Sequence, residues 1–184
     1  MDDDGKKGAH LKHLSDVMDK KVYDVNKKEL GVAKDFEVSL SDSQVYLRVE
    51  GEPLKDLRNH MVEFFPMNEI DDMGESITMY KTLEELRDSV EHISMSNTPS
   101  YKATDLLGMH VTSETRMLGK VVDFSVDKQA NMIKIVVEGD VIREVKGEDR
   151  EAIPVDEIRE ISEKVVIQHD LDTLIKRLRE SKDV

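Results

Sequence analysis

The chain repeats itself at an offset of 88 residues, and this repeat constrains the fold more than any other feature. The offset aligns residues 31–95 with residues 119–183 without a gap, and 14 of the 65 pairs are identical. Unrelated sequence of this composition would give about 4 identities. With one residue removed, the register extends back to pair Asp16 with Asp105 and Val22 with Val111. The 184 residues therefore predict two homologous domains. We place them at residues 14–93 and 104–184, after a flexible leader at 1–13 and around a linker at 94–103.

Alternating apolar residues predict short strands in each repeat, because a half-buried strand turns every second side chain toward the core. The first long strand is expected to bury Val32, Phe36, Val38 and Leu40 in the first repeat, and Val122, Phe124 and Val126 in the second. The next strand is expected to bury Val45, Leu47 and Val49, or Ile133, Ile135 and Val137. Pro66 and Pro154 then mark a corner, because proline has no N–H to donate to a sheet. Five or six short strands in about 80 residues predict a mainly β fold of two tandem small antiparallel β-barrels.

Each repeat is expected to end in a short amphipathic helix. Thr82 and Asp170 are typical N-cap residues, because their side-chain oxygens accept hydrogen bonds from the free N–H groups of a first helical turn. The apolar residues that follow have helical spacing: Leu83, Leu86 and Val90 in the first repeat, and Leu171, Leu174, Ile175 and Leu178 in the second. Each helix should lay this apolar stripe on a sheet or on the end of a barrel.

Two motifs occur in both repeats in the same order. A Leu-Gly-x-x-x-Asp-Phe segment lies at residues 30–36 and 118–124, and a Pro-x-x-x-Ile segment lies at residues 66–70 and 154–158. Through these motifs each half resembles the PRC-barrel, a small β-barrel named for the photosynthetic reaction centre. The resemblance covers nearly the whole chain after residue 13.

The first motif also has a physical meaning of its own. Its glycine allows the chain to bend sharply into the strand, and Phe36 and Phe124 are expected to point into the core. Asp35 and Asp123 are expected to bond locally near that bend rather than to act in catalysis, which would require a second perturbed group nearby.

A chain of two such barrels and little else resembles the archaeal cell-division PRC-barrel proteins, the cell division protein B group. The resemblance implies a cytoplasmic, non-enzymatic adaptor that binds SepF, the membrane anchor of the FtsZ ring, and reaches the division site on the inner face of the membrane through that partner. It also implies a homodimer, or pairing with related PRC-barrel proteins. One alternative is an RNA-processing or ribosome-assembly factor that binds a ribosomal protein. Another is a small-ligand sensor with a pocket between the barrels.

Composition limits the classes of function. The chain has no cysteine, which excludes disulfides, thiol nucleophiles and cysteine-ligated metals. Residues 14–93 carry 19 acidic and 10 basic side chains, and residues 104–184 carry 18 and 13, within a net charge of −13. Such acidity repels phosphate backbones and argues against nucleic acid as a partner. The apolar runs are too short to span a membrane, and residues 1–10 lack an apolar signal segment, so we expect a soluble intracellular protein.

The sequence contains only weak indications of metal-binding or catalytic motifs. His10 and His13 have a spacing that suits two metal ligands, but no third ligand is placed with them. Asp71 and Asp72 form an acidic pair that is more typical of a solvated turn than of a cation site. The sequence has neither a phosphate-binding glycine loop nor a catalytic serine elbow. We therefore expect no enzymatic activity, no cofactor and no metal.

Two features indicate contact surfaces. The first is the number of methionines, ten in all, because methionine adapts to irregular partners as well as to cores. They include Met61, Met67, Met117 and Met132. The second is Val136, which takes the place that Arg48 has in the first repeat and makes the outer face of the second domain more apolar. We place a candidate protein interface at Lys134, Val136 and Glu138, with burial against the C-terminal helix as the alternative.

Overall fold

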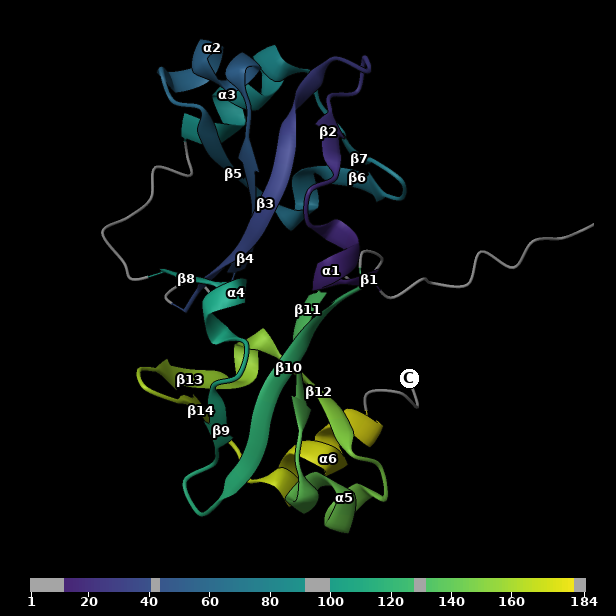
Figure 1. Ribbon diagram of the computed structural model, residues 1–184, viewed down its shortest axis with the longest axis vertical. Coiled ribbons are helices and arrows are strands. Elements are labelled where there is room, and N and C mark those ends of the chain that lie inside the picture. Colours follow the sequence, from purple (N-terminus) through teal and green to yellow (C-terminus); the bar gives the residue numbers. More distant parts are fainter. Residues whose placement is uncertain (1–11, 41–43, 92–99, 128–131, 181–184) are drawn as a thin grey trace, which may run out of the picture.

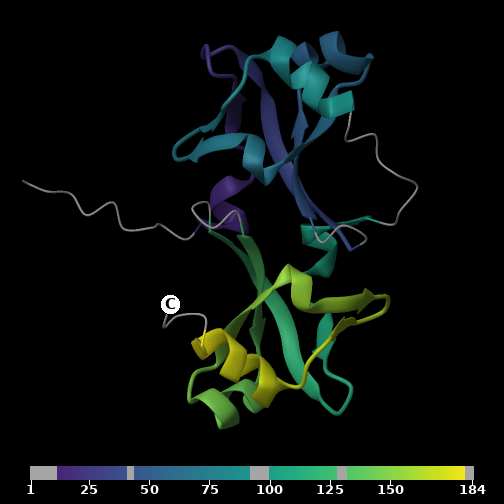
Figure 2. The same cartoon turned by 180° about the vertical axis from the view of Figure 1, so that it is seen from behind.

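The computed structural model describes residues 12–40, 44–91, 100–127 and 132–180, and it contains two separate β-sheets, one for each repeat (Figure 1). The described residues up to Glu91 are called the first half, and those from Ser100 onward the second half. The two halves are stacked along the long axis of the molecule, and the helices α2 and α3 lie at one end while α5 and α6 lie at the other (Figures 1 and 2). The protein is mainly β, as the sequence predicts.

In the described residues the first sheet has seven strands, in the order β5-β4-β3-β2-β7-β6, with β8 added to β3. Its strands are β2 (Lys21–Tyr23), β3 (Glu29–Ser39), β4 (Gln44–Glu50), β5 (Val62–Pro66), β6 (Ile70–Met73), β7 (Ile77–Met79) and β8 (Ser100–Lys102). The other elements of the first half are β1 (Lys12–His13), α1 (Leu14–Val17), the 3-10 turn η1 (Glu52–Leu54), α2 (Lys55–Arg58), the 3-10 turn η2 (Met67–Glu69) and α3 (Leu83–Glu91).

The second sheet, over the same described ranges, also has seven strands, in the order β12-β11-β10-β9-β14-β13, with β1 added to β10. Its strands from the second half are β9 (His110–Thr112), β10 (Met117–Asp127), β11 (Met132–Glu138), β12 (Arg150–Pro154), β13 (Ile158–Ile161) and β14 (Val165–Ile167). The helices and turns of this half are α4 (Ala103–Leu106), α5 (Asp140–Lys146), η3 (Val155–Glu157) and α6 (Leu171–Glu180). Every element from β3 to β7 thus has its counterpart 88 residues later.

Among the described strands each sheet contains one parallel pair, so the expectation of purely antiparallel barrels is wrong in this respect. β2 pairs with β7 in parallel, and β9 pairs with β14 in parallel. The cause is the proline corner, where β5 runs through η2 into β6 without reversing direction, so that β7 returns parallel to β2.

The same corner brings the ends of two edge strands together. The three residues of η2 span at most about 10 Å, so the sheet must curl to bring β5 near β6. In the described part of the chain no pairing of β5 with β6, or of β12 with β13, closes a sheet.

A β-bulge in the long strand changes which residues face the core. The pairing shifts between Ala33 and Asp35 in β3, and between Val121 and Asp123 in β10. A bulge adds a residue to one strand and so reverses the alternation on one side of it. Val121 is therefore buried, whereas Val122, which was expected in the core, is 39% exposed.

The two glycines that are shared between the repeats allow two backbones to approach closely. A Cβ atom on Gly119 would fall well inside contact distance of the Glu138 carbonyl oxygen and would lie 3.0 Å from the Gly139 Cα. Gly31 stands in the same relation to Glu50 and Gly51. These glycines are therefore needed because neighbouring strands approach closely, a reason that differs from the bend expected from the sequence.

The predicted helices and caps are confirmed. The Thr82 hydroxyl accepts from the Glu85 N–H at 3.2 Å, and the Asp170 carboxylate accepts from the Thr173 N–H at 2.9 Å. The apolar stripes are buried at Leu83, Leu86, Leu171, Leu174 and Ile175, while the side chains of Val90 and Leu178 lie outside the described part. No helix within the described ranges has the length and apolar character needed to cross a bilayer.

We expect the cap of α6 to make stability depend on pH. The Thr173 backbone N–H holds the pKa of Asp170 below its ordinary value of 3.8. The ionised carboxylate therefore adds stability above that ordinary value, and this contribution disappears as pH falls through the lower pKa of the folded state. Asp170→Asn keeps a capping acceptor but does not titrate. Urea midpoints should favour the unmutated protein at about pH 6, and the gap to the variant should narrow as pH falls below 3.8. A gap that stays constant would contradict this role.

Candidate functional site

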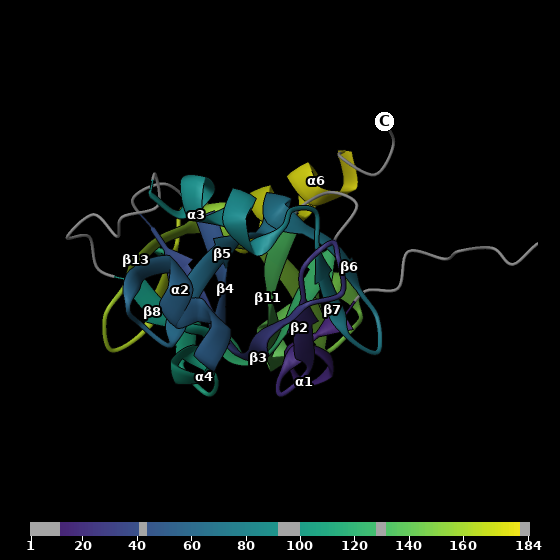
Figure 3. The same ribbon diagram turned by 90° about the horizontal axis from the view of Figure 1, so that it is seen from above.

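The junction between the halves is built by a reciprocal exchange of strands. β1, at the start of the first half, pairs antiparallel with β10 of the second sheet, and β8, at the start of the second half, pairs antiparallel with β3 of the first sheet. Each added strand continues into a short helix, α1 packing against β10 and α4 against β3. We call Lys12–Val17 the first arm and Ser100–Leu106 the second arm. Seen along the long axis, α1 and α4 lie on one side of the molecule, opposite α3 and α6 (Figure 3).

These arms include residues that the sequence places outside the domains. Lys12 and His13 belong to the expected leader, and Ser100–Lys102 belong to the expected linker, yet both segments are strands. In the first sheet β2 pairs with only part of one edge of the long strand β3, and β8 of the second arm pairs further along that edge. In the second sheet β9 and β1 pair with β10 in the same way. Because an open strand edge leaves N–H and C=O groups unpaired, each half completes the sheet of the other.

Asp35 anchors the second arm. Its carboxylate accepts from the neighbouring Phe36 N–H at 2.8 Å, which is the local bond that the sequence predicts. It also accepts from the backbone N–H of Thr104 at 3.3 Å and from the Thr104 hydroxyl. Asp35 is only 6% exposed, so these bonds lie in a protected environment. One carboxylate therefore fixes its own strand and the first turn of α4.

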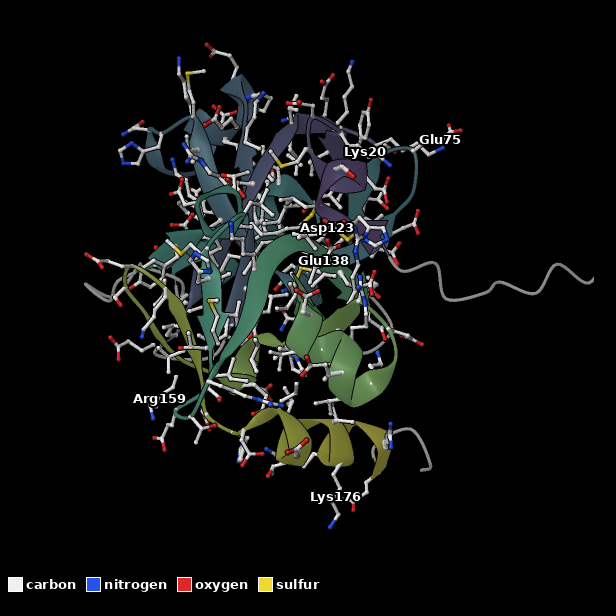
Figure 4. The ribbon with its side chains drawn as sticks, turned by 60° about the horizontal axis from the view of Figure 1, so that its bottom comes forward. Lys20, Glu75, Asp123, Glu138, Arg159 and Lys176 are labelled. Atoms are coloured by element: carbon white, nitrogen blue, oxygen red, sulfur yellow. The ribbon has the colours of Figure 1, made fainter. Side chains whose placement is uncertain are left out.

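Asp123 anchors the first arm in the equivalent way. It accepts from the Phe124 N–H at 2.7 Å and from the Leu14 N–H, 109 positions away, at 3.3 Å. Its second oxygen lies 2.9 Å from His13 Nδ1. Asp123 lies in the middle of the molecule, away from Arg159 and Lys176 at its lower edge (Figure 4). His13 is thus a partner of this carboxylate, and His10 lies outside the described residues.

Other contacts tie the second arm to both sheets. Tyr101 lies in β8, and its hydroxyl donates to the Ile161 carbonyl of the second sheet at 3.1 Å. Ser100 donates its hydroxyl to Glu37 Oε1 at 2.7 Å. Ala103 and Leu106 of α4 are fully buried in the hydrophobic core. The two halves therefore share core residues as well as hydrogen bonds.

We expect the halves to stay together when the chain between them is cut. Once a protease site inserted between Glu91 and Ser100 has been cut, the two fragments should co-elute at the position of the uncut 21.1 kDa chain, because each sheet keeps its exchanged strand. Gel filtration under native conditions measures this directly. Separation of the fragments at micromolar concentration would contradict the exchange.

The residues of the predicted interface lie on β11. Val136 is only 9% exposed and stands directly opposite Asp123, beside the junction. Lys134 is half-buried, and Glu138 is exposed and forms an ion pair with Arg150 at 2.6 Å. The low exposure of Val136 leaves little apolar surface there for a partner. The interface at these residues stays a prediction.

A small cavity lies between the halves, and larger ones lie near the end helices. The cavity between the halves has a volume of about 130 Å³ and is lined by residues of β4, η2, β11, β12 and η3. Cofactor and drug-sized ligands occupy pockets of roughly 300–1,000 Å³. The junction cavity is therefore too small for such a ligand.

The cavity of about 470 Å³ near α3 is lined in part by Asp24, whose carboxylate accepts hydrogen bonds from the backbone. Buried Asp24 accepts from the N–H groups of Asn26 and Lys28, both at 2.9 Å, and from that of Leu83 at 3.2 Å. These bonds tie the β2–β3 turn to the start of α3. Asp24 thus has a structural role at this cavity.

Titratable side chains elsewhere form structural pairs. Buried Glu157 lies 2.6 Å from His169 Nδ1 and 2.7 Å from Arg177 Nη1, which fastens α6 to the corner at η3. A hydrogen bond from Arg143 lowers the pKa of Asp149 and raises the pKa of Arg143, so neither group is tuned toward neutral pH. Among the described residues no group of three acidic or histidine side chains is placed to hold a metal.

Comparison with known proteins adds no relative. No protein-family model matches the chain, and no curated protein matches it. The resemblance to the PRC-barrel therefore rests on the two motifs and on their repetition.

Proposed function

We propose that the protein is a non-enzymatic adaptor of archaeal cell division that binds a SepF-like membrane anchor of the FtsZ ring through protein contacts. The two motifs and their order in both repeats support this proposal, and so does the chain's organisation as two similar β-rich halves. We also propose that each half is a PRC-type barrel whose edges approach without pairing, and that the protein acts at the inner face of the membrane through its partner.

The reciprocal exchange of arms is the observation that carries the proposal. Because Asp35 and Asp123 each hold the start of the other half, the halves act as one unit that presents two related surfaces. An adaptor gains from such a unit, since two sites in fixed relation raise the effective concentration of the second contact. Pairing with a second copy or with a related barrel would double the number of sites.

Purified protein and the SepF-like protein of the same cells provide the test. Isothermal titration calorimetry should give a saturable dissociation constant in the micromolar range or below, about −8 kcal/mol or better. Tagged protein should gather at the division site in dividing cells. Diffuse signal throughout division and no heat of binding would overturn the proposal, and capture of ribosomal proteins in their place would favour the ribosome-assembly alternative.

A further inference from the structure

The two arms occupy equivalent places on the two long strands. Lys12 of the first arm stands opposite Val126 of β10. Tyr101 of the second arm stands opposite Val38 of β3, which is the residue 88 positions before Val126. Both arms lie at mid-height in the molecule, and each continues into its short helix (Figure 1). The junction therefore has an approximate two-fold symmetry, in which the same kind of surface occurs on both sides.

The contacts of each arm are equivalent as well. Asp123 accepts from the first turn of α1, and Asp35 accepts from the first turn of α4. Each short helix buries two apolar side chains, which are Leu14 and Val17 in α1 and Ala103 and Leu106 in α4. Each long strand thus holds an arm through its backbone edge, one carboxylate and an apolar contact.

These contacts are the same whether an arm belongs to the same chain or to a second copy. Two chains that exchange halves form both junctions again, so the contacts that are lost on opening are regained in the dimer. The single chain and the dimer differ in the connection through residues 92–99. A tether of this length holds the partner half at an effective concentration on the order of millimolar, so exchange between chains competes at about that concentration.

We propose that a second copy of this chain binds through the arms, so that the first half of one chain forms the junction with the second half of another. The surface that receives the second copy is the edge of β3 or β10 that the chain's own arm covers in the single chain. The exchanged dimer has two complete junctions, and mass action favours it where copies of the chain are concentrated. The inference goes beyond the proposed function and is independent of the protein that an adaptor would bind.

Disulfide formation tests the exchange without background, because the sequence has no cysteine. Ser39 of β3 and Ser100 of β8 stand opposite each other, and the Cα atoms of such antiparallel partners lie within disulfide range. Ser39→Cys and Ser100→Cys are made in separate chains, incubated together at about 1 mM and then oxidised. Non-reducing electrophoresis should show a covalent dimer, and peptide mapping should find position 39 of one chain linked to position 100 of the other.

Ser76→Cys provides the matched control for chance collisions. Ser76 lies between β6 and β7, outside the arms and the long strands. Mixed with Ser100→Cys under the same conditions, it should give at least about tenfold less covalent dimer than Ser39→Cys. Equal yields from the two mixtures would overturn the exchange.

The kinetics separate exchange from an ordinary surface contact. Because Asp35 holds an arm in both forms, Asp35→Ala in both cysteine variants should raise the rate of exchange about tenfold or more and leave the final yield nearly unchanged. Asp71→Ala, at an exposed position on β6, should change neither quantity. A rate that Asp35→Ala leaves unaltered would also count against the exchange. The calorimetric titration with SepF-like protein is independent of this result, so failure of the exchange would leave the adaptor function standing.

Discussion

Replacing Gly119 with alanine is expected to lower the free energy of unfolding by about 3 kcal/mol. The added Cβ would be forced against the Glu138 carbonyl oxygen and the Gly139 Cα, both of which are backbone atoms that cannot rotate away. Either β10 and β11 must separate, or the pairing of Lys120 with Glu138 must be lost. Urea unfolding followed by circular dichroism measures the change through the shift in midpoint at constant slope.

Gly147 is the matched control for this substitution. It ends α5 at φ +82°, and a Cβ there meets nothing within 4 Å. Gly147→Ala should therefore cost only about 1 kcal/mol, from the left-handed backbone alone. If Gly119→Ala costs no more than Gly147→Ala, the close approach of the two strands is not what fixes glycine at position 119.

The sequence predicted the long strands well and their faces less well. Phe36, Val38, Phe124 and Val126 are buried, as the alternation indicates. Val122 was misplaced because the bulge before Asp123 shifts the alternation by one residue. A bulge of this kind has no signature in apolar spacing, because its cause is the pairing with a second strand.

The helix that each repeat adds between two strands was missed. α5 covers Asp140–Lys146, between Gly139 and the left-handed Gly147. A glycine after a helix is a known stop signal, so these flanks were a usable indication. The segment has only three apolar residues among charged ones, too few for the periodicity to stand out from a loop.

The exchanged arms could not be predicted from the sequence, because they depend on contacts between residues far apart in the chain. β1 and β8 are two and three residues long, shorter than any pattern can identify. The hydrogen bond from the Phe36 N–H to the Asp35 carboxylate could be predicted, because the two residues are adjacent in the chain. The bond of Asp35 to Thr104 spans 69 positions, and only the pairing of β8 with β3 brings the two residues together. The candidate interface at Lys134, Val136 and Glu138 stays a prediction.

Replacing Asp35 with alanine is expected to lower the free energy of unfolding by about 3 kcal/mol and to loosen the second arm. The change removes a buried acceptor from the Phe36 N–H and from both donors of Thr104. Hydrogen bonds to a charged group are worth about 1.5–3 kcal/mol, and donors that remain buried without a partner add to the cost. Hydrogen exchange should show the loosening as lost protection of the Ala103–Leu106 amides relative to those of β4.

A double-mutant cycle with Thr104→Val assigns this effect to the junction. If the carboxylate and the hydroxyl interact, the loss in free energy of unfolding of the double variant should be smaller than the sum of the two single losses by about 1 kcal/mol or more. Asp71→Ala on β6 provides the control, because it removes the same charge from an exposed position and should change stability by less than about 0.5 kcal/mol. Additive costs for Asp35→Ala and Thr104→Val would mean that Asp35 supports only its own strand. The coupling of the halves would then have to come from apolar burial at Ala103 and Leu106, which are both fully buried.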